Sequence, residues 1–247
     1  MDHLDLASAI LDFQSARRRA KLEQVLARLT GASSDLLNYE EVRKKLRATH
    51  TTKRGLQNIP INAIVGSVGR YTDFTRSFLP RQDEDQSRWA RVEAAMTDLG
   101  GLPPVEVYQI GDAYFVMDGN HRVSVARQLG AAYVEAYVTE CHTSVPLSPD
   151  VKAEDLIVKA EYADFLEHTR LDTLRPDADL SMSLPGKYRD LEEHISVHRY
   201  FMGVEQEREI PVAEAVAHWY DAVYWPVIEI IRGNGILRNF PDRTETD

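Results

Sequence analysis

The stretch from Tyr114 to Gly130 runs YFVMDGNHRVSVARQLG. Apolar residues from Tyr114 to Met117 predict a strand, and the polar turn Asp118-Gly119-Asn120 follows at once. A helix is predicted from this turn to Gly130. The stretch therefore predicts a strand that passes through a tight turn directly into a helix.

The first turn of a helix offers backbone N–H groups without intrahelical acceptors and the positive end of the helix dipole. An anion such as phosphate fits there. Gly119 permits a close approach of the backbone. Arg122 supplies a planar fork of donors and His121 a donor of tunable charge. Asp118 is a candidate to take a proton or hold a metal on a phosphate.

The same residues also allow a purely structural interpretation. Asp118 would then cap the helix, Asn120 would relieve the turn, and Asp118 with Arg122 would form an i,i+4 ion pair. Spacing alone leaves both interpretations open.

Working outward, Gly111-Asp112 is a typical hairpin turn between strands predicted at 105–110 and 113–117. A helix is expected at 89–99 and a further strand at 133–138. Short apolar pieces at 59–61 and 64–65 complete a small mixed sheet with helices. The fold class expected is α+β.

The predicted domains are an N-terminal helical arm at 1–55, a core at 56–145 and an acidic helical domain at 146–247. Residues 1–55 carry 11 Lys+Arg against 7 Asp+Glu, whereas residues 148–247 carry 11 against 21. DNA contact depends on cations that face phosphates, so only the N-terminal arm could supply it. Its basic cluster consists of Arg43, Lys44, Lys45, Arg47, Lys53 and Arg54.

The chain has 247 residues, a formal net charge of −10, 43% hydrophobic residues and one cysteine, Cys141. A lone cysteine excludes an internal disulfide. No apolar run approaches the length of a membrane span and the N-terminus is acidic, so a cytoplasmic protein with no membrane partner is expected. His194 and His198 have helical i,i+4 spacing, but Ile195 stands where a zinc protease has glutamate, so no metal site is predicted.

The segment from Ile59 to Glu140, about a third of the chain, resembles the ParB/sulfiredoxin fold. Asp118-Gly119-Asn120-His121-Arg122 occupies the position of the GERR box of ParB-type partition proteins. It is also similar to the GGCHR box of sulfiredoxins and, most closely, to the DGHHR box of free-serine kinases. The resemblance implies that Gly119, Asn120, His121 and Arg122 bind nucleotide phosphates.

In that fold the loop after the first strand faces the turn at residues 118–122, which we call the signature turn. The resemblance therefore adds Arg70 and Arg76 as phosphate ligands. It also adds Asp73 as a second catalytic candidate beside Asp118. Salt bridges within the loop are the structural alternative. Asn120 stands in the position of the sulfiredoxin cysteine, so reduction of sulfinic acids is not expected. No helix-turn-helix of the ParB type is recognisable after the core.

These features predict a nucleotide-binding protein that takes ATP, ADP or CTP with magnesium. Phosphotransfer and nucleotide hydrolysis are the reactions considered. The alternative is a ParB-like, DNA-associated or transcriptional regulator that uses the nucleotide as a switch, with DNA on the N-terminal arm. A homodimer is compatible with the aromatic residues near the C-terminus.

Overall fold

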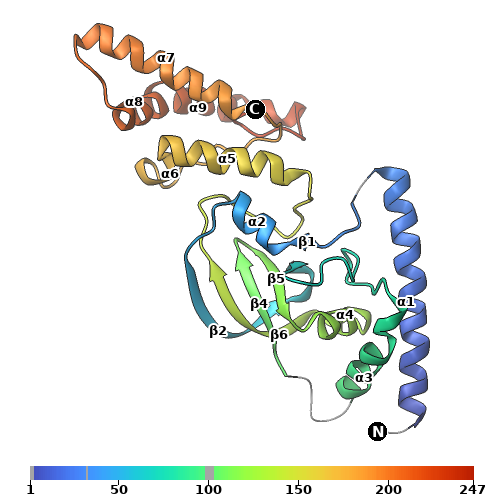
Figure 1. The fold of residues 1–247 in the computed structure, drawn as a ribbon. Coiled ribbons are helices and arrows are strands. Elements are labelled where there is room, and N and C mark those ends of the chain that lie inside the picture. The colour runs from blue at the N-terminus through green and yellow to red at the C-terminus, as the bar shows by residue number, and fades with distance from the viewer. Residues whose placement is uncertain (1–2, 32, 98–102) are drawn as a thin grey trace. The chain divides into compact units, whose positions relative to one another are not determined.

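The computed structural model describes residues 3–31, 33–97 and 103–247. The chain divides into two compact units, Met1–Ala153 and Glu154–Asp247. Figure 1 labels most of the helices and strands of both units. Within the described residues, no helix has the length and apolar character needed to cross a membrane.

The first unit contains a six-stranded mixed sheet and four α-helices among its described residues. The strand order is β1-β3-β5-β4-β6-β2, and only the β4–β5 and β6–β2 pairs are antiparallel. This arrangement confirms the expected mixed α+β fold. The strands are β1 (Leu37–Asn38), β2 (Thr51–Pro60), β3 (Ile64–Ser67), β4 (Val105–Ile110), β5 (Ala113–Asp118) and β6 (Tyr133–Cys141), and the helices are α1 (His3–Thr30), α2 (Tyr39–Lys45), α3 (Gln86–Thr97) and α4 (Asn120–Gln128).

The hairpin between β4 and β5 turns at Gly111, as the sequence predicts. Ile110 pairs with Ala113 across the turn, and Gly111 has a φ of +57°. A side chain at this position would place Cβ 2.6 Å from the Leu147 carbonyl oxygen. Asp112 N–H donates to the same oxygen at 2.8 Å, so the turn is fixed against the segment that follows the sheet.

Helix α4 packs on one face of the sheet, where Val123 joins Val107 and Val116 in the core. Ser124 lies on the buried side of α4. Its hydroxyl donates to the Phe78 carbonyl at 2.6 Å and accepts from the Trp89 indole at 2.9 Å. These bonds tie α4 to α3 and to the loop that follows β3.

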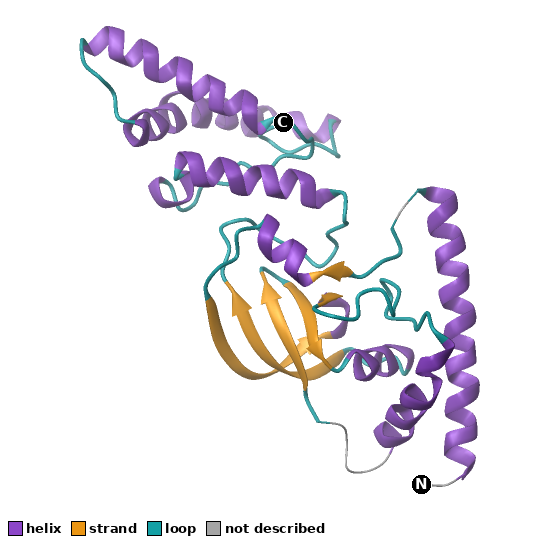
Figure 2. Ribbon diagram, in the orientation of Figure 1, coloured by secondary structure: helices purple, strands orange, loops and turns teal. Residues whose placement is uncertain are grey.

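The opposite face of the sheet is covered in part by α2 (Figure 2). Tyr39 stacks on Tyr108 with ring centroids 4.4 Å apart and lies beside Phe115. Side chains alternate between the faces of a strand, so Tyr108 lies opposite the core face that Val107 enters. Two helices of different length therefore sandwich the strands that lead to the signature turn.

Two strand segments extend beyond the sequence prediction. Strand β1 lies within the segment expected to be a helical arm, and β2 begins at Thr51, so it crosses the domain boundary expected between residues 55 and 56. In β2 every residue except Ile59 is exposed. Strand β2 forms an edge of the sheet. Because it buries little apolar surface, its backbone pairing with β6 is what holds it in place.

The second unit is helical, as the sequence predicts. Tyr162 and Tyr188 stack 5.1 Å apart, and the Tyr188 hydroxyl donates to the Leu180 carbonyl at 2.9 Å. Its helices are α5 (Asp155–Thr169), α6 (Leu171–Leu174), α7 (Tyr188–Gln206), α8 (Val212–Trp219) and α9 (Trp225–Asn234), with a π-helical turn at Tyr220–Tyr224.

Candidate functional site

The turn between β5 and α4 is centred on Gly119. Its φ of +109° belongs to the region that favours glycine. A Cβ here would lie 2.7 Å from Val105 Cγ1 and 3.0 Å from Arg122 Nε. The first helical bond runs from Val123 N–H to the Gly119 carbonyl at 3.0 Å. The N–H groups of residues 120–122 precede that bond, so α4 begins with donors that suit an anion.

A cavity of about 190 Å³ lies at this turn. The N-terminal residues of α4 form one wall. Arg70, from the loop after β3, and Arg88, from α3, add two positive charges to the lining. Val92 and Met117 add apolar surface. The cavity is smaller than the 300–1,000 Å³ usual for a whole small-molecule ligand, so its size suits phosphate groups better than a complete nucleotide.

The arginines of the cavity differ in what already holds them. Arg122 donates through Nη1 to the carbonyls of Pro103 and Pro104, at 2.7 and 2.8 Å, and through Nη2 to Asp118. The ion pairs that Arg70 makes with described residues are two long ones, to Asp73 and Asp85, each at 3.6 Å.

Arg88 is exposed and makes no ion pair within the described part of the chain. Arg70 and Arg88 are thus the cations most available to a ligand.

His121 is buried at the base of the site. Its Nε2 lies 3.4 Å from Asp85 Oδ1, and its ring packs edge-on against Phe74. Burial, reinforced by the positive charges of Arg88 and Arg70, lowers the pKa of His121 to about 4. His121 is therefore neutral near pH 7 and can serve as a hydrogen-bond donor or acceptor without adding charge.

Asp85 stands beside His121 with 12% of its side chain exposed. Burial, and repulsion by Asp73, raise the pKa of the Asp85 carboxyl, while Arg70 and Arg88 oppose the shift. Asp85 Oδ2, Asn120 Oδ1 and both ring nitrogens of His121 are buried without hydrogen-bond partners among the described residues. Such unpaired polar groups are costly, and a bound water, ion or ligand group would satisfy them.

The structure brings together most of the residues predicted from sequence. Six of them line the cavity: Arg70, Asp118, Gly119, Asn120, His121 and Arg122. Asp118 does not cap α4, because Gly119 is the N-cap residue and the cap has no side-chain bond. Asp118 instead forms the i,i+4 pair with Arg122 that the structural interpretation expected.

Arg76 and Asp73 do not line the cavity. Arg76 donates to the carbonyls of Val65 and Val151, at 3.0 and 2.5 Å, so its half-buried guanidinium holds the core instead of facing the turn. Asp73 acts on the site from outside the cavity, through its 3.6 Å contact with Arg70 and its repulsion of Asp85. For these two residues the salt-bridge and packing alternative describes the contacts better than ligand binding.

Sequence reasoning missed Asp85 and Arg88. Asp85 ends the short 3-10 turn Asp83–Asp85, and Arg88 lies in the first turn of α3, which follows directly. Both are far in sequence from the signature turn. The acidic run Asp83-Glu84-Asp85 followed by Arg88 is the signal that was available. Nothing in its spacing connects it to residues 118–122.

The basic cluster of the N-terminal arm is partly neutralised. Three of its members form ion pairs: Arg43 with Glu40, Lys45 with Glu41, and Arg54 with Glu140. The cluster therefore offers DNA less positive charge than its sequence implies.

Farther along the chain, His198 contacts His218, with Nε2 and Nδ1 2.8 Å apart, and not His194. Over the described residues, no group of three side chains of metal-ligand type is assembled.

Residues 47–149 match the family model of the ParB N-terminal domain. Among solved structures, the chain is similar to sulfiredoxin from Arabidopsis thaliana, with 17% sequence identity between the two chains and a TM-score of 0.26. The similarity covers 34% of this chain and 82% of that one. No curated protein matches the chain.

Proposed function

We propose that the protein binds the phosphate groups of a nucleotide at the turn from Asp118 to Arg122. The match of residues 47–149 to the ParB N-terminal domain model supports this proposal, because the turn lies within the matched segment. One observation carries the proposal. The N-terminus of α4 opens into the same small cavity as Arg70 and Arg88. Backbone donors and two available guanidinium groups in one space form a site for phosphate.

Each residue has a role in this proposal. Gly119 lets the phosphate approach the backbone, and the first N–H groups of α4 donate to it. Arg70 and Arg88 neutralise its charge. Arg122, fastened to the carbonyls of Pro103 and Pro104, holds the turn against the start of β4.

Magnesium would accompany a nucleoside triphosphate, and magnesium sites commonly combine one or two carboxylates with phosphate oxygens and water. Asp118 is the carboxylate among the residues that line the cavity, and 62% of its side chain is exposed. It fits a metal that arrives with the phosphates.

We propose binding alone and assign no reaction. Asp118 is paired with Arg122, and Asp73 does not line the cavity. Neither carboxylate predicted for catalysis therefore combines a place in the cavity lining with freedom from an arginine partner.

Calorimetry with ATP, ADP, CTP and GTP, each with and without magnesium, tests the proposal. Replacing Arg88 with Gln removes one charge-assisted contact of about 1.5–3 kcal/mol, so affinity for the preferred nucleotide should fall about tenfold or more. Arg91→Gln is the matched control, because Arg91 lies on the same helix, bonds only locally to the Ser87 carbonyl and does not line the cavity.

The proposal fails if the folded wild-type protein binds none of the four nucleotides. It also fails if Arg88→Gln and Arg91→Gln have equal effects on affinity. A regulator that acts on DNA would instead bind duplex DNA with a steep salt dependence.

A further inference from the structure

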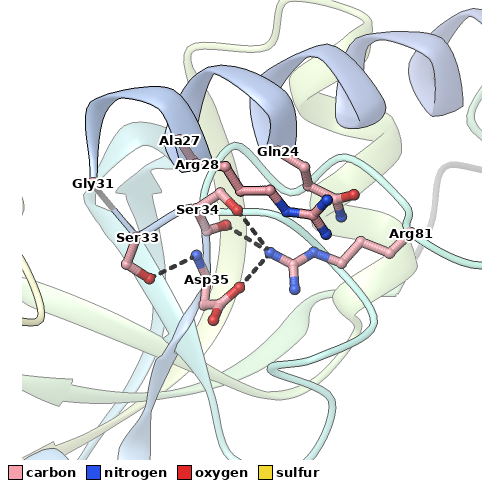
Figure 3. Close-up of a pocket in the computed structure, with 8 residues that line it drawn as sticks. All are labelled: Gln24, Ala27, Arg28, Gly31, Ser33, Ser34, Asp35 and Arg81. Carbon is pink, nitrogen blue, oxygen red and sulfur yellow. Dashed lines mark hydrogen bonds and ion pairs between the residues drawn. The ribbon is translucent and has the colours of Figure 1, made fainter.

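A second polar cavity of about 380 Å³ lies between the C-terminal part of α1 and the loop that carries Arg81. Its polar lining consists of Gln24, Arg28, Ser33, Ser34, Asp35 and Arg81. Figure 3 shows the guanidinium groups of Arg28 and Arg81 and the amide of Gln24 directed into the same space. None of these six residues belongs to the site at the Asp118–Arg122 turn.

Arg81 is held rigidly by one edge. Its Nη2 donates to the carbonyl and the hydroxyl of Ser34, at 3.0 and 3.1 Å, and pairs with Asp35 at 2.5 Å. Its Nε is buried and has no partner among the described residues, and its Nη1 makes no hydrogen bond to a described residue. Because the bonds of Nη2 hold the guanidinium in position, Nη1 is the Arg81 donor that remains available to a ligand.

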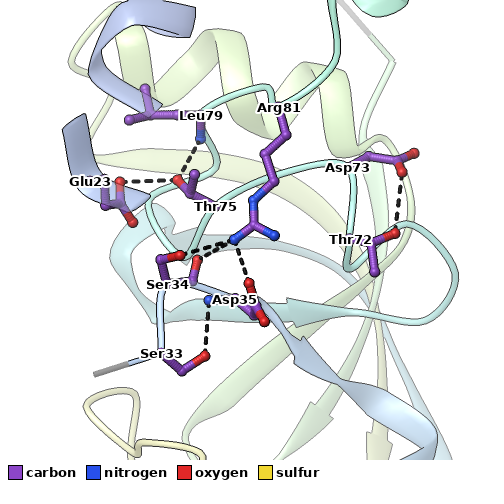
Figure 4. Close-up of polar contacts among 9 residues, drawn as sticks. All are labelled: Glu23, Ser33, Ser34, Asp35, Thr72, Asp73, Thr75, Leu79 and Arg81. Atoms are coloured by element: carbon purple, nitrogen blue, oxygen red, sulfur yellow. Dashed lines mark hydrogen bonds and ion pairs between the residues drawn. The ribbon is translucent and has the colours of Figure 1, made fainter. Parts of the chain in front are cut away.

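Arg28 is exposed and has no carboxylate partner in the described ranges. Asp35 is the sole acidic residue in the lining, and Arg81 already holds it. Glu23 lies next to Gln24 in sequence, but its carboxylate accepts from the Thr75 hydroxyl at 3.0 Å (Figure 4). Two guanidinium groups thus share a space in which one carboxylate balances one of them.

The negative end of the α1 dipole opposes an anion at this place. That opposition is reduced, because the Thr30 hydroxyl donates to the Leu26 carbonyl at 3.0 Å in the last turn. The two arginines carry full charges close to the cavity, whereas the dipole contributes partial charges, so the arginines decide the sign of the site.

We infer that this cavity is a second anion site, and that its ligand is a phosphate group, free or on a small metabolite. The fork of Arg28, the outer donors of Arg81, the Gln24 amide and the serine hydroxyls outnumber the acceptor sites of a carboxylate. A phosphate has the additional oxygen and charge to use them.

Titration of the uniformly ¹⁵N-labelled full chain with inorganic phosphate, and separately with pyrophosphate, at constant ionic strength tests the inference by NMR. Saturable shifts are expected for the backbone amides of Ser33, Ser34 and Asp35 and for the Gln24 side-chain amide. Arg28→Gln should weaken this binding about tenfold or more. The Arg28 side chain makes no hydrogen bond or ion pair with a described residue, so the variant should fold normally.

Arg18→Gln is the control, since Arg18 is an exposed arginine of the same helix that does not line the cavity. Absence of shifts at residues 33–35 at tens of millimolar phosphate overturns the inference. Equal binding by Arg28→Gln and wild type, or an equal loss in Arg18→Gln, also overturns it. Shifts at residues 119–122 report the first site in the same spectra, so failure of one site is distinguishable from failure of the other.

Discussion

Glu93 is a carboxyl group that the fold keeps out of water. It lies on α3 with 6% exposure, and its Oε2 has no partner among the described residues. Burial, with repulsion from Asp12 of α1, raises the pKa of Glu93 to about 7. A raised folded-state pKa stabilises the protein below the unfolded value of 4.5, and this contribution is lost as pH rises through about 7.

We therefore expect Glu93→Gln to increase the free energy of unfolding at pH 8 by about 2–3 kcal/mol, and to have little effect near pH 4.5. Urea unfolding of variant and wild type at both pH values measures the difference. Glu84→Gln, at an exposed position of the 3-10 turn that precedes α3, should have little effect at either pH. A Glu93→Gln effect that does not change with pH would contradict the raised pKa.

His121 gives the free energy of unfolding the opposite pH dependence, in the wild type and in Glu93→Gln alike. Its depressed pKa, about 4 against 6.5 in the unfolded chain, gives a stability contribution that is complete above pH 6.5 and is lost as pH falls through about 4. The comparison of Glu93→Gln with wild type cancels this shared term. It also means that the wild-type chain is destabilised toward both ends of the pH range.

At the scale of elements, Arg127 ties α4 to the start of β3 and to the segments before and after that strand. Its guanidinium donates to the carbonyls of Ile61, Ile64 and Arg76, at 2.8, 2.7 and 3.3 Å, and lies 4.9 Å from the centre of the Phe78 ring. Burial lowers the pKa of Arg127 to about 10, so it stays charged at neutral pH.

Arg127→Met should reduce the free energy of unfolding by about 3 kcal/mol or more, because it leaves partly buried carbonyls without donors. Chemical unfolding monitored by circular dichroism measures the loss. Arg91→Met, at an exposed arginine of α3, should cost less than about 0.5 kcal/mol. Similar losses in the two variants would show that the three carbonyl bonds contribute nothing specific.

The elements found correctly from sequence are those with a strong local signal. The β4–β5 hairpin has its Gly-Asp turn, and α4 follows a strand directly through a glycine. Strand β1 has two residues, and β2 is exposed on nearly all of its length, so neither carries an apolar pattern. Both strands form because a neighbouring strand supplies their hydrogen bonds. The partner strands lie elsewhere in the sequence, so a local pattern does not predict the pairing.

The same distinction explains the site. Residues 118–122 are contiguous and could be found from their order along the chain. Arg88 lines the cavity and Asp85 lies beside His121, and both depend on contacts between distant segments, such as the bond from Trp89 of α3 to Ser124 of α4. The Arg76 guanidinium donates to the backbone carbonyls of residues 65 and 151. Residue spacing in the sequence does not predict hydrogen bonds from a side chain to distant backbone oxygens.

At the scale of the whole molecule, all residues of both proposed sites belong to the unit Met1–Ala153. A fragment of residues 1–153 should therefore fold cooperatively and retain nucleotide affinity within about threefold of the full chain. Circular dichroism melting and calorimetry of fragment and full chain provide the measurement. A fragment that melts without a cooperative transition would show that the helical unit is needed for the first unit to fold.

The division of the tryptophans between the units has an optical consequence. Trp89 is completely buried in the first unit and donates to Ser124, whereas Trp219 and Trp225 belong to the second. With the latter two replaced by phenylalanine, the emission of the full chain would come from one indole held between α3 and α4. Its wavelength would follow the opening of the first unit alone, from the residue that adjoins Arg88, without any attached dye.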